Sequence, residues 1–276
     1  MINMSKIDIK SSGTDRGNIL DKIVAKKRQE IDSDRQRIPI IRLEESEIFS
    51  RECYSLKEFI LNPALTGVIA EFKRQSPSKG VINSTSGVKQ VTNGYAAAGA
   101  SALSVLTDRS FFGGRKRDLV AARKANQIPV LRKEFMLDEY QVVEAKALGA
   151  DIILLIAAIL SPQEIQKLAK LAKGLGMNVL LEVHNKEELD RSLFSELDAV
   201  GVNNRNLGDF SVSLQHSYDL VEHIPKEFLK ISESGLSDPK TITELRKAGF
   251  DGFLIGENFM KEKDPGKAMQ EFVAGF

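Results

Sequence analysis

The chain has 276 residues, of which 42% are hydrophobic and 28% are charged, and its formal net charge is +1. This length supplies enough apolar material for a large buried core, in one large domain or in two ordinary ones. The near-neutral charge is spread along the chain, which gives no basis for binding nucleic acid or an anionic membrane. One cysteine, Cys53, and three histidines predict neither an internal disulfide nor a metal site.

The apolar segments are too short to span a membrane. The longest run, Ile152 to Leu160, has nine residues, whereas a membrane-spanning helix needs roughly 20. The first ten residues, "MINMSKIDIK", lack the apolar core of a signal peptide. We therefore expect a soluble, cytoplasmic protein.

Residues 1–60 are predicted to form an N-terminal extension that contains an amphipathic helix. The segment "NILDKIVAKKRQEI" (Asn18 to Ile31) begins with a suitable N-cap, Asn18, and places its apolar residues on one stripe. The segment "RQRIPII" then ends the helix. This periodicity is compatible with a lid over the following domain and with a plug at its bottom.

From residue 61 onward, an internal repeat predicts the architecture. In each copy a helix ends at a glycine (Gly99, Gly149 or Gly249), small or polar residues follow, and an apolar strand begins. The glycine is the expected left-handed helix C-cap, and the continuous apolar runs suit strands that are buried on both faces. The clear copies are "AAAGASALSVL" from Ala96, "KALGADIILLI" from Lys146 and "RKAGFDGFLIG" from Arg246, and a weaker copy is "ELDAVGVNN" from Glu196.

Further strands and helices alternate between these copies. Eight strands are expected from Gly67 to Asn258, at roughly 25 residues per strand-helix unit, which is the arithmetic of a TIM barrel. A doubly wound sheet would use six of them and leave two unexplained. We therefore predict an α/β fold in which residues 61–276 form a single (β/α)8 barrel, one catalytic domain. The added strands are "GVIAEFK" from Gly67, "PVLRKEF" from Pro129, "NVLLEVH" from Asn178 and "FLKISES" from Phe228, and clear helices are Pro162–Lys173 and Pro239–Lys247.

Four charged residues stand at the ends of odd-numbered strands. Glu71 and Lys73 end the first strand, Lys133 lies on the third and Glu182 on the fifth. The active site of a TIM barrel lies at the carboxyl ends of the strands, and side chains from alternate strands share one layer. An isolated inward pair is often structural, but four buried charges are costly unless they are paired or used. We therefore expect them to meet at the barrel mouth, below the loop that contains Ser76.

The last two strand ends have the features of a phosphate site. Ser234-Gly235 and Gly256-Glu257 are either simple turns or the phosphate cradle that this fold often builds after its seventh and eighth strands. Phe112 and Phe135 are either packing residues or the walls of a flat apolar pocket. The histidines are expected to be surface or packing residues (His184, His216 and His223).

These residues lie in segments that resemble the indole-3-glycerol-phosphate synthase family, the barrel enzymes of tryptophan biosynthesis. The likeness covers roughly residues 17 to 262 and includes the extension "ILDKIVAKKRQEI". Two departures are Glu134, where the family commonly has Asp, and "INSTSGVKQV", which lacks the acidic residues of many members. The matching segments occur in the family's order: "IAEFKRQSPSKG", "SVLTDRSFFGG", "PVLRKEF", "DEYQVVEAKALGADIILLIAAIL", "LLEVHN", "VGVNNRNL", "ISESGL" and "FLIGENFM".

The resemblance implies a carboxy-lyase, a carbon-carbon lyase that acts on 1-(2-carboxyphenylamino)-1-deoxyribulose 5-phosphate. The ring carbon that bears the carboxylate attacks the ketone, CO2 leaves, water leaves, and an indole remains. The resemblance implies no cofactor and no partner other than this small sugar-phosphate substrate, and a monomer is expected.

The resemblance also implies roles for the charged residues. Lys133 would be the principal general acid, and Lys73 would pair with the substrate carboxylate and share in proton transfer. Glu182 would act as general base or proton carrier in the dehydration. Glu71 would hold the lysines charged and oriented.

The remaining site residues would bind the substrate. Asn203 and Ser234 would fix its hydroxyls or its amine, and Glu257 would act only through its backbone, because its carboxylate repels phosphate. The other substrate- and phosphate-binding candidates are Ser76, Phe112, Phe135, Arg205, Gly235 and Gly256.

Two alternative functions have distinct requirements. A related barrel such as phosphoribosylanthranilate isomerase would need a Cys-Asp acid-base pair at strand ends, whereas Cys53 precedes the barrel. A non-catalytic barrel subunit would be expected to have lost at least one inward charge, whereas all four are present.

Overall fold

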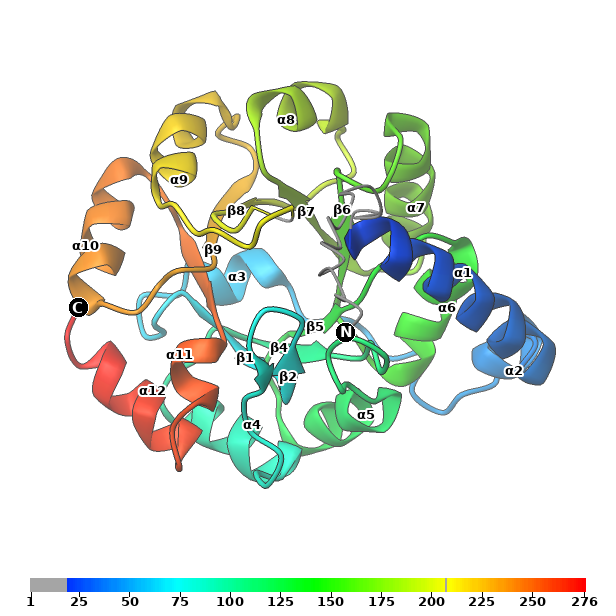
Figure 1. Cartoon of the computed structure of the whole chain (residues 1–276). Coiled ribbons are helices and arrows are strands. Elements are labelled where there is room, and N and C mark those ends of the chain that lie inside the picture. The colour runs from blue at the N-terminus through cyan, green and yellow to red at the C-terminus, as the bar shows by residue number, and fades with distance from the viewer. Residues whose placement is uncertain (1–18, 207) are drawn as a thin grey trace, which may run out of the picture.

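The computed structural model describes residues 19–206 and 208–276 of the chain (Figure 1). Eight parallel strands close into a barrel in the order β1-β10-β9-β8-β7-β6-β5-β4. The predicted (β/α)8 barrel is therefore confirmed, and closure excludes the doubly wound sheet. The barrel strands are β1 (Val68–Phe72), β4 (Ala102–Leu106), β5 (Val130–Lys133), β6 (Ile152–Ile156), β7 (Asn178–Val183), β8 (Ala199–Asn203), β9 (Leu229–Glu233) and β10 (Gly252–Ile255).

A ring of helices surrounds the strands, as the outer ribbons of Figure 1 show. Gly149 and Gly249 are left-handed C-caps, with φ of 88° and 111°, and Gly99 (φ 85°) follows the first helix of the ring. The predicted glycine caps are therefore confirmed. The helices are α4 (Val88–Ala97), α5 (Lys116–Ala125), α6 (Glu139–Leu148), α7 (Pro162–Gly174), α8 (Lys186–Ser192), α9 (Gln215–Leu220) with the 3-10 turn Val221–His223, α10 (Pro239–Ala248), α11 (Glu257–Met260) and α12 (Pro265–Val273).

The predicted N-terminal helix is present and is longer than expected. Helix α1 (Ile19–Arg37) continues past Ile31, and the pair between Asp34 and Arg37, 2.7 Å apart, supports its last turn. Asn18, the expected N-cap, lies outside the described residues. Lys27 of α1 contacts groups that follow β4 and β5, so α1 lies at the carboxyl end of the barrel and is not a bottom plug.

The plug is formed by a helix that the sequence analysis did not single out. After the short α2 (Ile40–Glu44), α3 (Leu56–Ile60) packs Leu56 and Ile60 into the apolar cluster inside the barrel. The backbone N–H of Leu56 donates to Oδ1 of Asn178, the first residue of β7, at 3.1 Å. Helix α3 therefore closes the amino end of the barrel. The carboxyl end of the barrel is left for a site.

Two apolar cores lie on either side of the barrel wall. In β1, Val68, Ala70 and Phe72 belong to the core between strands and helices, whereas Ile69 belongs to the core inside the barrel. Because side chains alternate along a strand, Glu71 shares the inward face with Ile69. The same alternation directs the other odd-strand charges to the interior.

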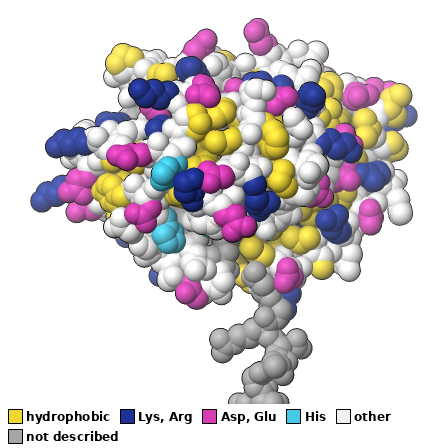
Figure 2. Space-filling model, turned by 90° about the horizontal axis from the view of Figure 1, so that it is seen from above, with side chains coloured by type: hydrophobic (Ala, Val, Ile, Leu, Met, Phe, Trp, Pro, Cys, Tyr) yellow, Lys and Arg dark blue, Asp and Glu magenta, His cyan; other side chains and the backbone are white. Residues whose placement is uncertain are grey.

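The outer surface is mixed in charge. Figure 2 shows one side of the molecule, on which Lys and Arg side chains are interspersed with Asp and Glu side chains. Within residues 19–206 and 208–276, no helix combines the length and the apolar character that crossing a membrane requires.

Leu56→Ala tests the plug. Leu56 is fully buried, so truncation should lower the free energy of unfolding by about 3 kcal/mol through lost burial and the cavity left behind. Leu61 stands at the end of the same helix, and its side chain is 51% exposed. Leu61→Ala should therefore change the free energy of unfolding by less than about 0.5 kcal/mol. Urea denaturation measures both. Equal effects would mean that α3 does not close the barrel.

Candidate active site

The first strand ends in an ion pair inside the barrel mouth. Lys73 Nζ lies 3.0 Å from Glu71 Oε1, and Ser104 of the adjacent β4 donates to Glu71 Oε2 at 3.3 Å. A Cβ at position 256 would lie 2.6 Å from Glu71 Oε1. Gly256 therefore leaves the space that the Glu71 carboxylate occupies.

The third, fifth and seventh strands meet at a lysine whose side chain is 15% exposed. Lys133 Nζ donates to Glu182 Oε2 at 2.7 Å and to Glu233 Oε2 at 3.0 Å. Asn203 Nδ2, at the end of β8, donates to Glu182 Oε1 at 2.9 Å. The direct ion-pair partners of Lys133 are therefore Glu182 and Glu233, whereas Glu71, which was expected to hold both lysines charged, pairs directly with Lys73.

Glu233 is the functional candidate that the sequence analysis missed. Ser234 and Gly235 were selected after this strand and Glu233 was not, although Glu233 alternates with Ile231 and so shares its inward face. A Cβ at Gly201 would lie 2.1 Å from Glu233 Oε1, so the carboxylate depends on a glycine in the neighbouring β8. The parity of strand positions could have identified Glu233. Its contact with Lys133 required the structure.

The two carboxylates that share Lys133 differ in electrostatics. Burial raises the pKa of Glu233 to about 7, and the Glu182 carboxylate adds to this shift while Lys133 opposes it. Burial also opposes ionisation of Glu182, but Lys133, His184 and the Asn203 amide lower the pKa of Glu182 to about 2. One of the two carboxyl groups can therefore hold a proton near neutral pH while the other stays ionised.

Lys133 itself stays charged. Burial favours its neutral form, but the carboxylates of Glu182, Glu233 and Glu71 overcome this effect and raise the pKa of Lys133 above its ordinary value. The ammonium group therefore holds a proton throughout the neutral range. This proton is available for transfer to a bound group.

His184 lies closer to the charged cluster than the sequence analysis suggested. Its Nε2 is 3.5 Å from Glu182 Oε1, and its Nδ1 is 3.2 Å from Glu188 Oε2. Burial lowers the basicity of the ring, but the contacts with Glu188 and Glu182 prevail and raise the pKa of His184. The imidazole therefore stabilises the ionised form of Glu182.

Two adjoining hollows open above the cluster. An apolar one of about 140 Å³ contains Phe112 and Phe135, whose ring centroids are 5.9 Å apart, and the side chain of Lys133. A wider, more polar one of about 490 Å³ is lined by the turns after β9 and β10, including Gly235 and Gly256. Residues that line both hollows connect them: Glu71, Lys73, Ser78, Arg205, Phe210, Ser234, Leu254 and Glu257.

A small hairpin follows β1 at this mouth. Strands β2 (Gln75–Ser76) and β3 (Gly80–Val81) pair antiparallel, and Ser76 is buried, with its Oγ accepting the backbone N–H of Lys79 at 3.3 Å. Ser76 lines the apolar hollow. The predicted loop above the charged cluster is therefore an ordered hairpin.

The polar hollow combines cations with tight turns. Arg205 Nη2 lies 3.6 Å from Glu257 Oε2, and Lys79 Nζ lies 3.7 Å from Glu257 Oε1. Ser234 and Gly235 both have left-handed backbones, with φ of 69° and 76°. Such a turn exposes successive backbone N–H groups to one side, which suits an anion. Because Glu257 pairs with both cations, its carboxylate neutralises part of the charge at this turn.

The described residues contain no group of three or more His, Cys, Asp or Glu side chains arranged to hold a metal ion. Cys53 lies at the amino end of the barrel, where Sγ is 3.2 Å from Lys146 Nζ and 3.8 Å from the Ala150 carbonyl. It is therefore remote from the two hollows.

Comparisons with known proteins point to one family. The family model described as indole-3-glycerol phosphate synthase matches residues 20–272. Proteins of that name are similar: one from Bacteroides thetaiotaomicron is 46% identical over 93% of this chain and 98% of its own length. One from a Polaromonas species is 43% identical over 92% of this chain and 97% of its own length.

Solved structures with low sequence identity share the fold. "Crystal structure of KGPDC from Streptococcus mutans" aligns with a TM-score of 0.58 at 10% identity, over 75% of this chain and 95% of that one. "Native KDPGal structure" aligns with a TM-score of 0.54 at 16% identity, over 76% of this chain and 91% of that one. At this identity the likeness concerns the barrel alone.

Glu233→Gln tests the shared proton. The pKa of Glu233 is about 7 in the folded protein and 4.5 ordinarily. Between pH 4.5 and pH 7 the folded protein therefore keeps the Glu233 carboxyl group protonated, whereas the unfolded chain loses this proton. The wild type should therefore lose stability relative to Glu233→Gln as the pH rises from about 4.5 to 7, by about 3 kcal/mol in total.

Denaturation at pH 4.5 and at pH 7.5 measures this difference. The exposed Glu227→Gln is the control, and its stability should follow that of the wild type at both pH values. A constant difference between the wild type and Glu233→Gln would contradict the raised pKa.

Proposed function

Because the chain belongs to the indole-3-glycerol-phosphate synthase family, we propose that its barrel-mouth cluster performs the ring closure of that reaction. The enzyme is a carboxy-lyase of tryptophan biosynthesis, and its substrate is 1-(2-carboxyphenylamino)-1-deoxyribulose 5-phosphate. The observation that carries the residue assignment is the position of Lys133. Its ammonium contacts Glu182 and Glu233, and all three residues line the apolar hollow.

The two hollows match the two ends of this substrate. The flat carboxyphenyl ring fits the apolar hollow beside Phe112 and Phe135. The phosphate fits the polar hollow, where Arg205 and the backbone N–H groups of Gly235, Gly256 and Glu257 would hold it, while Ser76 closes the ring side. The ketone then lies between the hollows, near Lys133.

In the first step a carbon–carbon bond forms. The ring carbon that bears the carboxylate attacks the ketone carbon, and Lys133 transfers its proton to the ketone oxygen as negative charge develops there. Lys73 pairs with the substrate carboxylate until the bond between ring and carboxylate breaks. CO2 then leaves, and the released electron pair restores the aromatic ring.

The second step removes water. The new hydroxyl group leaves as water after it gains a second proton, which Lys73 supplies. Glu182 removes the proton from the adjacent carbon, and the double bond of the indole forms. The low pKa of Glu182 keeps it ionised for this task. Asn203, Ser234 and Glu71 hold the substrate and the lysines in place.

We extend the proposal to the organisation of the chain. Residues 61–276 act as one catalytic domain, and residues 1–60 are an extension of it. The enzyme works as a cytoplasmic monomer. A Cys-Asp isomerase site has no counterpart at this mouth among the described residues, because Cys53 lies at the other end of the barrel.

The turnover assay tests the function. Purified protein is mixed with the carboxyphenylamino ribulose phosphate, and indole fluorescence is followed. The chain contains no tryptophan, so the emission arises from the product. We expect fluorescence to rise as CO2 is released in equal amounts. Folded protein that produces neither would support a non-catalytic barrel.

Lys133→Met tests the general acid. The substitution keeps the length of the side chain and removes its proton, so kcat should fall by about 10²- to 10⁴-fold. Affinity for a non-reacting substrate analogue should change little. Lys170→Met, on the exposed face of α7, is the matched control and should retain the wild-type kcat. An unchanged kcat in Lys133→Met would remove Lys133 from this role.

A further inference from the structure

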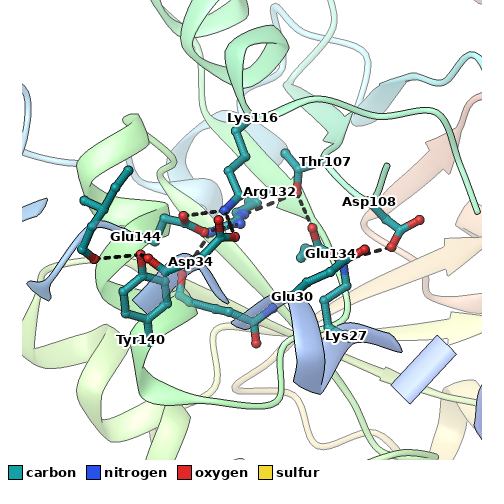
Figure 3. Close-up of polar contacts among 12 residues, drawn as sticks. Lys27, Glu30, Asp34, Thr107, Asp108, Lys116, Arg132, Glu134, Tyr140 and Glu144 are labelled. Carbon is teal, nitrogen blue, oxygen red and sulfur yellow. Dashed lines mark hydrogen bonds and ion pairs between the residues drawn. The ribbon is translucent and has the colours of Figure 1, made fainter. Parts of the chain in front are cut away.

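A buried lysine from outside the barrel contacts three carboxylates beside the apolar hollow. Lys27 of α1 has a side chain that is only 6% exposed. Its Nζ lies 2.7 Å from Glu30, 2.9 Å from Asp108 and 3.0 Å from Glu134 (Figure 3). Asp108 and Glu134 follow the neighbouring strands β4 and β5. Lys27 therefore connects α1 to two loops of the barrel mouth.

Asp108 orders the turn that carries Phe112. Its Oδ1 accepts the backbone N–H groups of Phe111 and Phe112, at 2.7 and 3.2 Å, while its Oδ2 faces Lys27. The turn is tight, because a Cβ at Gly114 would lie 2.3 Å from the Leu106 carbonyl oxygen. The position of Phe112 therefore depends on the orientation of the Asp108 carboxylate.

Glu134 has the same relation to Phe135. Its Oε1 accepts the backbone N–H of Phe135 at 2.9 Å and faces Lys27. Its Oε2 accepts from Thr107 Oγ1 at 2.7 Å, and Thr107 in turn accepts from Arg132 Nε at 3.2 Å. Both oxygens are thus engaged, and the carboxylate has one orientation.

We propose that Lys27 is a positioning residue that sets the aromatic wall of the apolar hollow through Asp108 and Glu134. One ammonium fixes two carboxylates, and each carboxylate fixes the backbone of one of the two phenylalanines that line the hollow. Lys27 lines neither of the two hollows. This inference rests on the proposed function, in which the hollow binds the carboxyphenyl ring.

The charges explain why a lysine is needed at this place. The side chains of Asp108 and Glu134 are 0% and 2% exposed, so without Lys27 two buried negative charges would face each other. Burial disfavours the ammonium form, but Glu134 and Asp108 overcome this effect and raise the pKa of Lys27. Loss of the cation should therefore release both carboxylates, and with them both turns.

A second ion-pair group offers a matched control. Lys116 of α5 contacts Asp34 of α1 and Glu144 of α6, and Arg132 contacts Glu144 at 2.7 Å (Figure 3). Lys116 also ties α1 to the barrel, but its carboxylate partners do not bind the backbone of Phe112 or Phe135. Lys116→Met therefore removes one attachment of α1 and breaks no direct contact of the two carboxylates that hold the aromatic wall.

The test compares two ligands in Lys27→Met and Lys116→Met. One ligand is the substrate with its ketone reduced to an alcohol, which keeps the ring and cannot react, and the other is inorganic phosphate. In Lys27→Met we expect about tenfold weaker binding of the reduced substrate, unchanged binding of phosphate, and kcat/KM lower by about 10- to 100-fold. Lys116→Met should bind both ligands as the wild type does.

A double-mutant cycle identifies the route of the effect. In a Phe112→Ala background, Lys27→Met should weaken binding of the reduced substrate by no more than about twofold, because the wall it positions is already incomplete. Should Lys27→Met not fold, as judged by circular dichroism, Glu134→Gln tests the same link. It keeps an oxygen for the Phe135 N–H and removes the ion pair, and it should also weaken ring binding selectively.

Three results would overturn the inference: equal losses for both ligands, equal losses in Lys27→Met and Lys116→Met, or independent effects in the cycle. For Glu134→Gln, unaltered binding of the reduced substrate would do the same. Absence of turnover by the wild type would instead refute the proposed function. The two failures are therefore distinguishable.

Discussion

The site is organised around one largely enclosed cation that two buried carboxylates share. Lys133 contacts Glu182 and Glu233 inside the barrel, where an ion separated from water costs several kcal/mol unless it is paired. Burial of the Glu233 carboxyl group, together with the excess negative charge of two carboxylates against one ammonium, raises its pKa to about 7. The cluster therefore alternates between neutral and anionic forms near physiological pH. A substrate that brings a carboxylate and a phosphate changes this balance when it binds.

Both the backbone and the side chains of the barrel make room for this charged cluster and enclose it. Gly201, in β8, leaves space for the carboxylate of Glu233 on the adjacent β9. Gly256, directly after β10, leaves space for the carboxylate of Glu71 on the adjacent β1. Helix α3 closes the opposite end with apolar side chains. The charged layer is consequently enclosed from below and opens toward the hollows, and its low exposure keeps its electrostatic interactions strong.

The N-terminal extension takes part in this arrangement from outside the barrel. Helix α1 contributes Lys27 to a group of buried carboxylates beside the apolar hollow, and Asp34 to a second group around Lys116 and Arg132 (Figure 3). Both groups join segments far apart in the sequence. The extension and the loops after β4 and β5 therefore form a single polar network, in which the loops hold the walls of the hollow and α1 holds the loops.

The sequence by itself determined the repeat of strands and helices, the glycine caps and the inward face of each strand, because these follow from local periodicity and backbone preference. Glu71, Lys73, Lys133 and Glu182 could be selected for the same reason. Only the tertiary structure decided which charges meet. The pairing of Lys133 with Glu233 joins residues 100 positions apart, and no local pattern encodes such a distance. The burial of Lys27 likewise depends on how α1 packs on the barrel, since a lysine on a helix is ordinarily solvated.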